Sequence, residues 1–383
     1  MASDGDTRPR FRVLVAGGGV AALESVLALR ELAGERVAVT VLAPGEELVY
    51  RPMTVREPFS YAAAGRYPLA PIVRELGAEL VTDALDRVER ERQTVVTEGG
   101  LELPYDALVL ALGAQPRPHY PHALTIDDRH MDEALHGLVQ EIEGGYLKSL
   151  TFLVPERIGW QLPVYELALM MAGRAYDTEA RPQITIVTAE PSPLALFGEA
   201  VSARVAEQLA AAGVETLTSS WAETPAAGEV VVEPGSRPFS PTRAIALPEL
   251  YGPAVRGLPA GEHGFLAIDE HCRVRDAGPV FAAGDATDFP VKHGGLGTLQ
   301  ADAAAEAIAA LAGAAVEPQP FRPVVHAMLL TDGEPLYLTA ALSGTTAISS
   351  EVSETPTWSP PTKIAARFLG PYLERLDREG APG

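Results

Sequence analysis

The stretch FRVLVAGGGVAALESVLALRELAGERVAVTVL, residues 11–42, decides the fold class. Its apolar pattern predicts a short strand, a glycine turn, a helix and a second strand. Gly17, Gly19 and Ala22 occupy the G-x-G-x-x-A positions of that turn. In a βαβ unit the first glycine permits a tight turn, the second lets the backbone approach a pyrophosphate, and the third small residue lets the helix pack close to the sheet. The stretch therefore predicts a dinucleotide site at a helix N-terminus.

One contact expected of such a site is missing from its usual place. An acidic residue at the end of the second strand normally binds a ribose hydroxyl, but Ala43 and Pro44 stand there. Glu46 and Glu47 follow in the next loop. The ribose contact is therefore left open, with the backbone as one candidate.

Composition narrows the class of protein. A chain of 383 residues is long enough for two or three domains with substantial cores. The formal net charge of −21 makes nucleic acid and anionic lipid poor partners. No apolar run approaches the ~20 residues that a membrane-spanning helix needs. We expect a cytoplasmic protein without an integral membrane segment, and peripheral membrane contact is the alternative.

Two later segments complete the pattern of the first one. Residues 105–116, YDALVLALGAQP, predict a strand and a small-residue turn, and residues 278–285, GPVFAAGD, predict another strand that ends at a Gly-Asp pair. Together with the first turn they resemble the two-dinucleotide-binding-domain flavoproteins of the pyridine nucleotide–disulfide oxidoreductase superfamily, over roughly residues 11–320. LVYRPM, residues 48–53, and PVKHGGLGTLQADAAAEAI, residues 290–308, resemble the sulfide:quinone oxidoreductase and type II NADH dehydrogenase branch.

The resemblance implies a non-covalent FAD and a set of residues that would bind it. Glycines and alanines of the first turn would hold the pyrophosphate, Asp285 the ribityl chain, and the start of a late helix would face the flavin pyrimidine. The implied residues are Gly17, Gly18, Gly19, Ala21, Ala22, Arg51, Pro52, Ala111, Gly113, Gly284, Asp285, Thr298 and Leu299.

Two residues near the flavin are implied to be catalytic. Lys292 and His293 follow Asp285 by seven and eight positions, in a loop that the resemblance places at the isoalloxazine edge. A lysine there would favour an anionic reduced flavin, and a histidine would pass a proton to an acceptor such as a quinone. Gln300 is a further candidate for a hydrogen bond to the flavin. No metal site is expected, since the histidines at 119, 122, 130 and 136 lack the spacing of zinc ligands.

The chain departs from this superfamily in its cysteines. Disulfide-using members and sulfide:quinone oxidoreductases work through paired cysteines, and this chain has only Cys272. A single cysteine forms no intramolecular disulfide. We therefore expect neither disulfide reductase activity nor sulfide oxidation by the usual route, and we interpret Cys272 as an ordinary turn residue.

The resemblance also implies the domain organisation. The fold class is α/β, with tandem Rossmann-like domains, the second inserted into the first, and a small C-terminal α+β segment. We expect the FAD-binding domain at 10–117 and 251–318, the inserted NAD(P)-binding-like domain at 118–250, and the C-terminal segment at 319–383. In that segment we expect two strands that meet at Asp332-Gly333, a Ser/Thr-rich connection, and a helical pattern interrupted at Pro371.

The nucleotide turn of the inserted domain has an unusual composition. TFLVPERIGWQLPVYELALMM, residues 151–171, predicts strand, turn and helix with one glycine in the turn. Pro155 lacks the backbone donor that a phosphate would use, and Trp160 and Pro163 are bulky where a cofactor would approach. Three alternatives stay open: NAD(P)H binds in an altered way with Arg157 as phosphate partner, the site has lost its ligand, or Trp160 forms part of a new pocket.

The functional expectation follows from these parts. We expect an FAD-dependent oxidoreductase that passes electrons to a quinone-like or other small acceptor without cysteine chemistry, with NAD(P)H a doubtful donor. The alternative is a flavin-binding sensor or an electron-transfer subunit of a larger complex. The expected partners are a small donor and a small acceptor, with a homo-oligomer left open.

Overall fold

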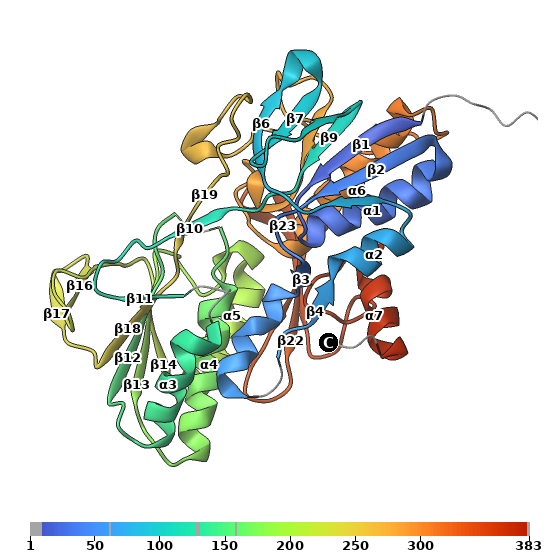
Figure 1. Ribbon diagram of the computed structural model, residues 1–383. Helices are drawn as coiled ribbons and strands as arrows, with labels where there is room; N and C mark the ends of the chain where they lie inside the picture. Colours follow the sequence, from blue (N-terminus) through green and yellow to red (C-terminus); the bar gives the residue numbers. More distant parts are fainter. Residues whose placement is uncertain (1–9, 61–62, 127–130, 158, 381–383) are drawn as a thin grey trace, which may run out of the picture.

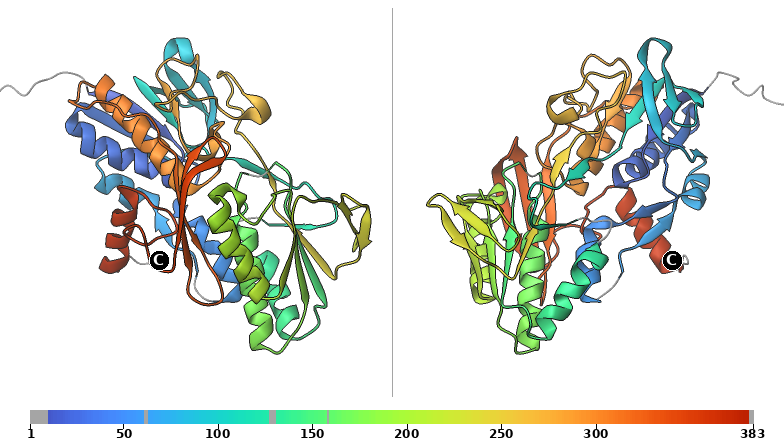
Figure 2. Two further views of the ribbon diagram at one scale, coloured as in Figure 1. Left: turned by 180° about the vertical axis from the view of Figure 1, so that it is seen from behind. Right: turned by 60° about the vertical axis from the view of Figure 1, so that its left-hand side comes forward.

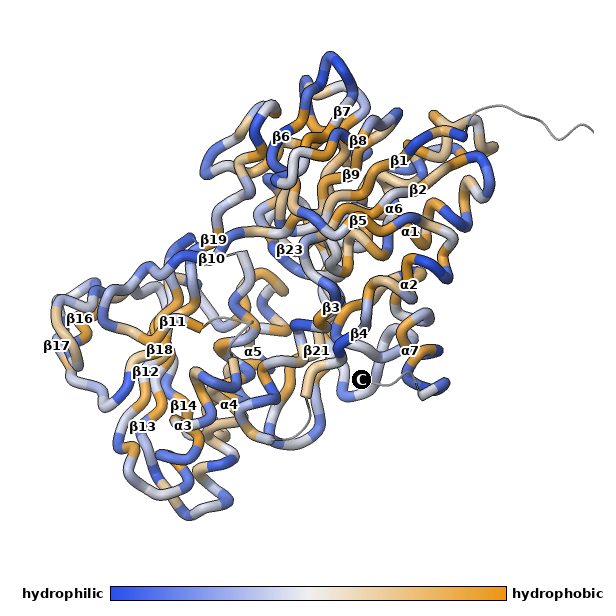
Figure 3. Tube along the Cα trace, in the orientation of Figure 1, coloured by the Kyte–Doolittle hydropathy of each residue, from blue (hydrophilic) through white to orange (hydrophobic). Residues whose placement is uncertain are grey.

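The structure has two α/β lobes joined by two chain crossings (Figure 1). It is a computed structural model that describes residues 10–60, 63–126, 131–157 and 159–380. Apolar strands form the centre of both lobes, and hydrophilic loops surround them (Figure 3). The crossings, β10 (Gln115–Arg117) and β19 (Glu249–Tyr251), pair antiparallel and hold the lobes together where the chain leaves the first lobe and returns to it.

The first lobe is built on a five-stranded parallel sheet in the order β20-β9-β1-β2-β5. Its strands are β1 (Phe11–Ala16), β2 (Val37–Leu42), β5 (Glu79–Val81), β9 (Ala107–Leu110) and β20 (Val280–Ala282). Because side chains alternate along a strand, Val13 and Val15 face the helices α1 (Val20–Ala33) and α6 (Gly294–Leu311). Leu14 and Ala16 face the antiparallel sheet of β6 (Leu85–Glu89), β7 (Thr94–Thr97) and β8 (Glu102–Pro104). The sheet is thus buried on both faces, as parallel sheets are.

The second lobe repeats this design with its own parallel sheet, in the order β11-β18-β12-β13-β14. Its strands are β11 (Leu124–Thr125), β12 (Ser149–Leu153), β13 (Gln183–Val187), β14 (Val214–Leu217) and β18 (Arg243–Ala246). The helices of this lobe are α3 (Met131–Glu143), α4 (Leu162–Asp177) and α5 (Glu199–Ala211). A small antiparallel sheet covers its outer side and consists of β15 (Trp221–Glu223), β16 (Val230–Glu233) and β17 (Arg237–Phe239).

The strands of the C-terminal segment lie between the lobes, and its last helix packs against the first lobe (Figure 2). It forms a three-stranded antiparallel sheet of β21 (Val324–Leu329), β22 (Leu336–Ser343) and β23 (Thr346–Ser353). The expectation of a Ser/Thr-rich connection was wrong, since those residues form β23, a largely exposed edge strand without an apolar face. The interrupted helical pattern was also wrong. Residues 354–368 form an irregular strap, and α7 (Leu369–Glu379) carries Pro371 in its first turn, where a helix needs no donor.

The fold class expected from the sequence is confirmed: α/β, with tandem Rossmann-like units and a small C-terminal α+β segment. The domain boundaries themselves remain predictions. Across the described residues, every helix is too short or too polar to cross a membrane.

Candidate functional site

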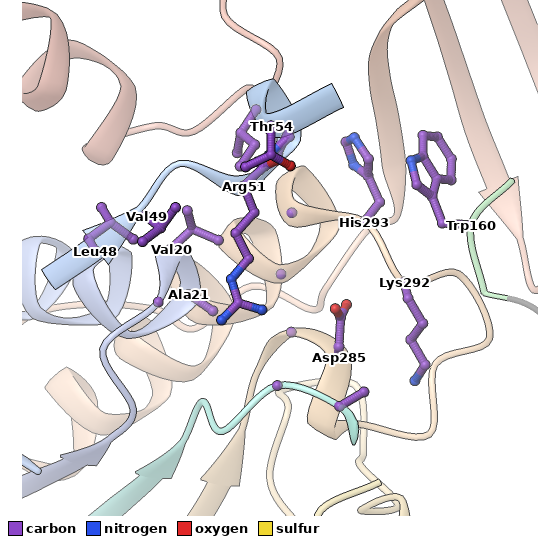
Figure 4. A pocket seen from close by; sticks show the side chains of 18 of the residues that line it. Val20, Ala21, Leu48, Val49, Arg51, Thr54, Trp160, Asp285, Lys292 and His293 are labelled. Carbon is purple, nitrogen blue, oxygen red and sulfur yellow. The ribbon is translucent and has the colours of Figure 1, made fainter. Parts of the chain in front are cut away.

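A cavity of about 600 Å³ lies where the two lobes and the C-terminal strap meet. Both lobes contribute to its walls, and its labelled side chains come from α1, the segment after β2, the Trp160 loop and the loop before α6 (Figure 4). The predicted residues that line it are Gly17, Gly18, Gly19, Ala21, Arg51, Pro52, Ala111, Gly113, Gly284, Asp285, Lys292 and His293. The fold therefore brings together residues that lie up to about 270 positions apart in the chain.

The glycine turn after β1 has the geometry of a phosphate cradle. Gly17 has φ +131°, and a Cβ there would stand 2.2 Å from the carbonyl oxygen of Ala111. Gly19 has no heavy atom within 4 Å of the place a Cβ would take, so the backbone is open toward the cavity. Gly19 is also the N-cap of α1, and the first helical hydrogen bond is that of the Leu23 N–H to its carbonyl. The donors ahead of Leu23 are left for a ligand.

The residues that follow β2 line the cavity beside the glycine turn, where a ribose contact was expected. Ala43 and Pro44 line the cavity through small apolar groups, and Glu47 also lines it at the start of β3 (Glu47–Val49). Glu47 therefore brings a carboxylate to the wall where the end of β2 offers none.

The opposite wall comes from the carboxyl ends of β9 and β20. Gly113 and Gly284 both have positive φ, +71° and +77°, which glycine adopts at little cost. Arg51 and Asp285 extend into the cavity from two sides (Figure 4). Gln300 does not reach it: its amide accepts the Gly284 N–H at 2.8 Å and donates to Thr287 at 3.3 Å, so it fixes the turn that carries Asp285.

Helix α6 begins earlier than the sequence pattern indicated. His293 is its N-cap and Gly294 its first residue, one turn before Thr298. The sequence did not indicate this start, because glycine has a low helix propensity. Close packing requires a glycine at one of these positions, since a Cβ on Gly297 would stand 3.0 Å from the Cα of Gly284. Three predicted residues lie outside the described cavity lining, namely Ala22, Thr298 and Leu299.

Lys292 and His293 extend in different directions from the same loop (Figure 4). The Lys292 ammonium donates to the Thr287 carbonyl and lies 3.9 Å from the ring centroid of Phe265. Burial lowers the pKa of Lys292 to about 8. His293 packs against Trp160 with ring centroids 4.6 Å apart, and burial lowers its pKa to about 3. At neutral pH the histidine is therefore uncharged.

Sequence reasoning missed a buried ion pair in the cavity wall. The Lys363 ammonium lies 2.5 and 2.7 Å from the two carboxylate oxygens of Glu166, and the Leu330 N–H donates to the same carboxylate at 2.9 Å. The side chains are 4% and 1% exposed. Burial raises the pKa of Glu166 and lowers that of Lys363, which brings the proton affinities of the two groups together. An acid within the apolar first part of helix α4 and a lysine in a lysine-poor chain were the available signals.

The N-terminus of α4 differs from that of α1 in ways that bear on nucleotide binding. Pro163 in its first turn has no N–H, and the Val164 N–H already donates to the Gln161 carbonyl at 3.0 Å. The turn itself packs onto the loop before α6: the Lys292 N–H donates to the Gly159 carbonyl at 3.0 Å, and a Cβ on Gly159 would stand 2.2 Å from Lys292. The space next to this backbone is therefore filled by the protein.

The acidic residue after β13 faces inward. Glu190 accepts a hydrogen bond from the Tyr165 hydroxyl at 2.6 Å and from the Ala195 N–H at 3.1 Å. Burial raises its pKa. In a dinucleotide-binding unit this position would bind a ribose hydroxyl, but here the carboxylate is engaged by its own domain.

Arg157 is engaged as well. Its guanidinium contacts the His263 ring and lies 3.6 Å from Glu249 and 3.4 Å from the Tyr251 hydroxyl, and its side chain is about half exposed. The candidate phosphate partner is thus held against the crossing strand β19.

The remaining candidates lie away from the cavity. Cys272 is fully buried in the core beside β20, and burial raises the pKa of its thiol. His119 faces Glu249, His136 faces the Pro58 carbonyl, and position 130 lies outside the described residues. Within the described ranges, no group of three or more His, Cys, Asp or Glu residues could hold a metal ion.

Comparison with known proteins finds a family model that matches the first part of the chain and solved structures with a similar fold. Residues 11–147 match the family model described as pyridine nucleotide-disulphide oxidoreductase. The structure is similar to that of a sulfide:quinone oxidoreductase from Aquifex aeolicus, with a TM-score of 0.82 and 18% identity over 97% of this chain and 93% of the other. It is also similar to a ferredoxin reductase from Rhodopseudomonas palustris, with a TM-score of 0.67 and 18% identity over 87% of this chain and 83% of the other. At this identity the likeness shows a shared fold.

The glycine turn, the open N-terminus of α1 and the positive-φ glycines of the opposite wall fit a dinucleotide cofactor on the side of the first lobe. The family match covers the segment that carries that turn. Residues 11–147 therefore match the pyridine nucleotide-disulphide oxidoreductase family, and the chain as a whole shares the fold of the two oxidoreductases named above.

Proposed function

We propose that this protein transfers electrons through FAD to a quinone-type small acceptor, with neither a cysteine pair nor NAD(P)H as donor. The observation that carries the proposal is the Glu166–Lys363 pair, because it lines the same cavity as the glycine turn while it is shielded from solvent. FAD, when bound, supplies two-electron transfer.

The residues around the first-lobe wall would hold the cofactor. The Gly17–Gly19 turn and the N-terminus of α1 would bind the pyrophosphate, and Glu47 the adenosine ribose. Asp285 would bind the ribityl chain, and the N-terminus of α6 would face the flavin pyrimidine. Arg51, Pro52, Ala111, Gly113 and Gly284 would shape the space for the rings.

The other part of the cavity is apolar and suits a planar, weakly polar acceptor. Its apolar lining includes Val55, Ile126, Met131, Leu162, Leu247 and Met328. A ligand pocket of this kind combines apolar walls with a few placed polar groups. The polar groups on this side are His293, Glu166 and Lys363.

Reduction of a quinone to its hydroquinone takes two electrons and two protons. FAD, when bound and reduced, would supply both electrons and one proton, and the Glu166–Lys363 pair would deliver the other proton, because burial draws the pKa values of the carboxylate and the ammonium toward one another. Lys292, with a pKa of about 8, would add positive charge beside the flavin at neutral pH.

The second lobe supports a donor other than NAD(P)H. Three features oppose a nicotinamide dinucleotide there: the Pro163 position without a donor, the packed Gly159 backbone and the inward-facing Glu190. Sulfide oxidation through a cysteine pair does not fit either, because the single cysteine of the chain is buried in the core.

The test uses the purified protein under anaerobic conditions. We expect bound FAD whose oxidised absorption band persists after addition of NADH and then NADPH, disappears with dithionite, and returns on mixing with duroquinone. Rapid bleaching by NADH or NADPH would contradict the donor assignment. A dithionite-reduced sample that duroquinone leaves reduced would contradict the acceptor assignment.

A further inference from the structure

The hydrogen bonds of His293 define its tautomer. The Gly295 N–H donates to His293 Nδ1 at 3.2 Å, so Nδ1 holds a lone pair and caps α6. A neutral imidazole has one protonated nitrogen. The proton therefore sits on Nε2, and this nitrogen is a donor.

That donor has no partner in the described part of the chain. The ring accepts the Gly295 N–H at Nδ1 and packs against Trp160. His293 is 8% exposed and lines the cavity, so Nε2–H has lost most of its contact with bulk water. A ligand that fills the cavity would take the remaining surface of this donor out of water, and a ligand oxygen that accepts the hydrogen bond would offset that cost.

The surroundings keep the ring neutral and oriented. Burial and the positive charge of Lys363 oppose a second proton, and His326 on β21 adds to the effect. Trp160 contacts one side of the ring at 4.6 Å between centroids, with the two rings tilted by 51° (Figure 4). The helix cap fixes the other side. The ring thus has two restraints on its orientation and a proton that it does not release at physiological pH.

We propose that His293 Nε2–H is a permanent hydrogen-bond donor that holds a carbonyl oxygen of the electron acceptor, which selects planar carbonyl acceptors of the 1,4-quinone class. This inference rests on the function proposed above. It replaces the proton-passing role implied for His293 with recognition, and leaves proton delivery to other groups of the cavity.

The chemistry of the acceptor agrees with such a donor. A quinone oxygen gains negative charge as the ring takes up electrons, and a fixed N–H donor in a site of low polarity stabilises that charge more strongly than the starting carbonyl. An imidazolium at this place would face the Lys363 charge. A neutral imidazole supplies the hydrogen bond without that repulsion.

Two amide variants separate the two nitrogens of the ring. His293→Asn places a side-chain oxygen near Nδ1, which keeps the helix cap and loses the donor. His293→Gln places an amide N–H near Nε2, which keeps the donor and loses the cap. The measurement is binding of duroquinone to the oxidised holoprotein by isothermal titration calorimetry, in which no turnover occurs. The control ligand is durene, which has the same shape without the two oxygens.

We expect His293→Asn to bind duroquinone about 10-fold more weakly than the native protein, as for one lost hydrogen bond. We expect His293→Gln to bind within about threefold of the native protein, although its thermal midpoint falls. Durene should bind the native protein and His293→Asn equally.

Three results would overturn the inference. Equal duroquinone affinity in His293→Asn and the native protein refutes the donor role alone, and equal weakening in both variants shows a packing or capping role instead. A native protein that fails to bind duroquinone refutes the proposed acceptor class, and the inference falls with it.

Discussion

The Glu166–Lys363 pair gives a prediction whose size follows from its burial. Lys363→Met removes the ammonium and leaves the Glu166 carboxylate, whose side chain is 1% exposed, with the hydrogen bond from the Leu330 N–H. Removal of one partner of a buried pair costs about 3–5 kcal/mol. Glu166→Gln should cost a similar amount, because it leaves the 4% exposed ammonium unpaired. The amide oxygen of Gln can still accept the Leu330 N–H.

The double variant Glu166→Gln, Lys363→Met should recover most of that loss. Both charges are then absent and the Leu330 N–H keeps an acceptor, so we expect a free energy of unfolding within about 1–2 kcal/mol of the native value. The measurement is urea unfolding followed by circular dichroism at pH 7, with FAD at one fixed excess concentration in every sample.

A surface pair provides the control. Arg243 and Glu141 stand 2.6 Å apart, but their side chains are 52% and 34% exposed. The same cycle there, with Arg243→Met and Glu141→Gln, should give a coupling of about 0–1 kcal/mol. If the double variant at Glu166 and Lys363 loses the sum of the two single losses, or if Lys363→Met costs less than about 1 kcal/mol, the reasoning about the buried pair is wrong.

The remaining predictions concern the turn, the histidine and the C-terminal helix. Gly17→Ala and Gly19→Ala should both lower the ratio of flavin to protein after purification. Only Gly17→Ala, which forces φ +131° on a residue with a Cβ, should destabilise the apoprotein in urea, by about 2 kcal/mol or more. The folded pKa of His293 is about 3, and an unfolded histidine binds a proton near pH 6.5. The unfolded state therefore holds more protons below that pH, so acidification from pH 7 to 5 should cost about 2 kcal/mol through this group, and urea unfolding of His293→Gln should lack that loss. Burial and the nearby Glu24 carboxylate raise the pKa of Asp302 to about 8, and Glu24 also accepts the N–H groups at the start of α7. A raised pKa favours folding at low pH, and this stabilisation is lost as the pH rises toward 8. The melting temperature of Asp302→Asn should therefore increase relative to that of the native protein between pH 5 and pH 8.

Much of the fold could be predicted because its signals are local. The first βαβ unit shows a short apolar run at each strand, a helical period between them and glycines where the turn requires them. Part of the second lobe could be followed in the same way, because β12 and α4 lie close to the strand and the helix predicted within residues 151–171. By contrast, β23 has no apolar period, because it is an exposed edge strand whose pairing with β22 comes from the backbone.

The site could be predicted only where one segment carries its own pattern. The glycine turn and the Gly284-Asp285 end of β20 are of this kind. The partners Glu166 and Lys363 lie 197 positions apart, and their contact depends on how the strap crosses between the lobes. The tautomer of His293 follows from the start of α6, which the glycines of its first turn concealed.

In the proposed function, the acceptor reacts in the apolar part of the cavity. The most direct test of this is the rate at which duroquinone reoxidises the dithionite-reduced protein in a stopped-flow experiment. Met328→Trp should fill that part of the cavity, since Met328 lines it from β21. We predict normal FAD content and a reoxidation rate at least about 10-fold slower than in the native protein, which corresponds to about 1.4 kcal/mol in the barrier. Equal rates in the two proteins would contradict the account.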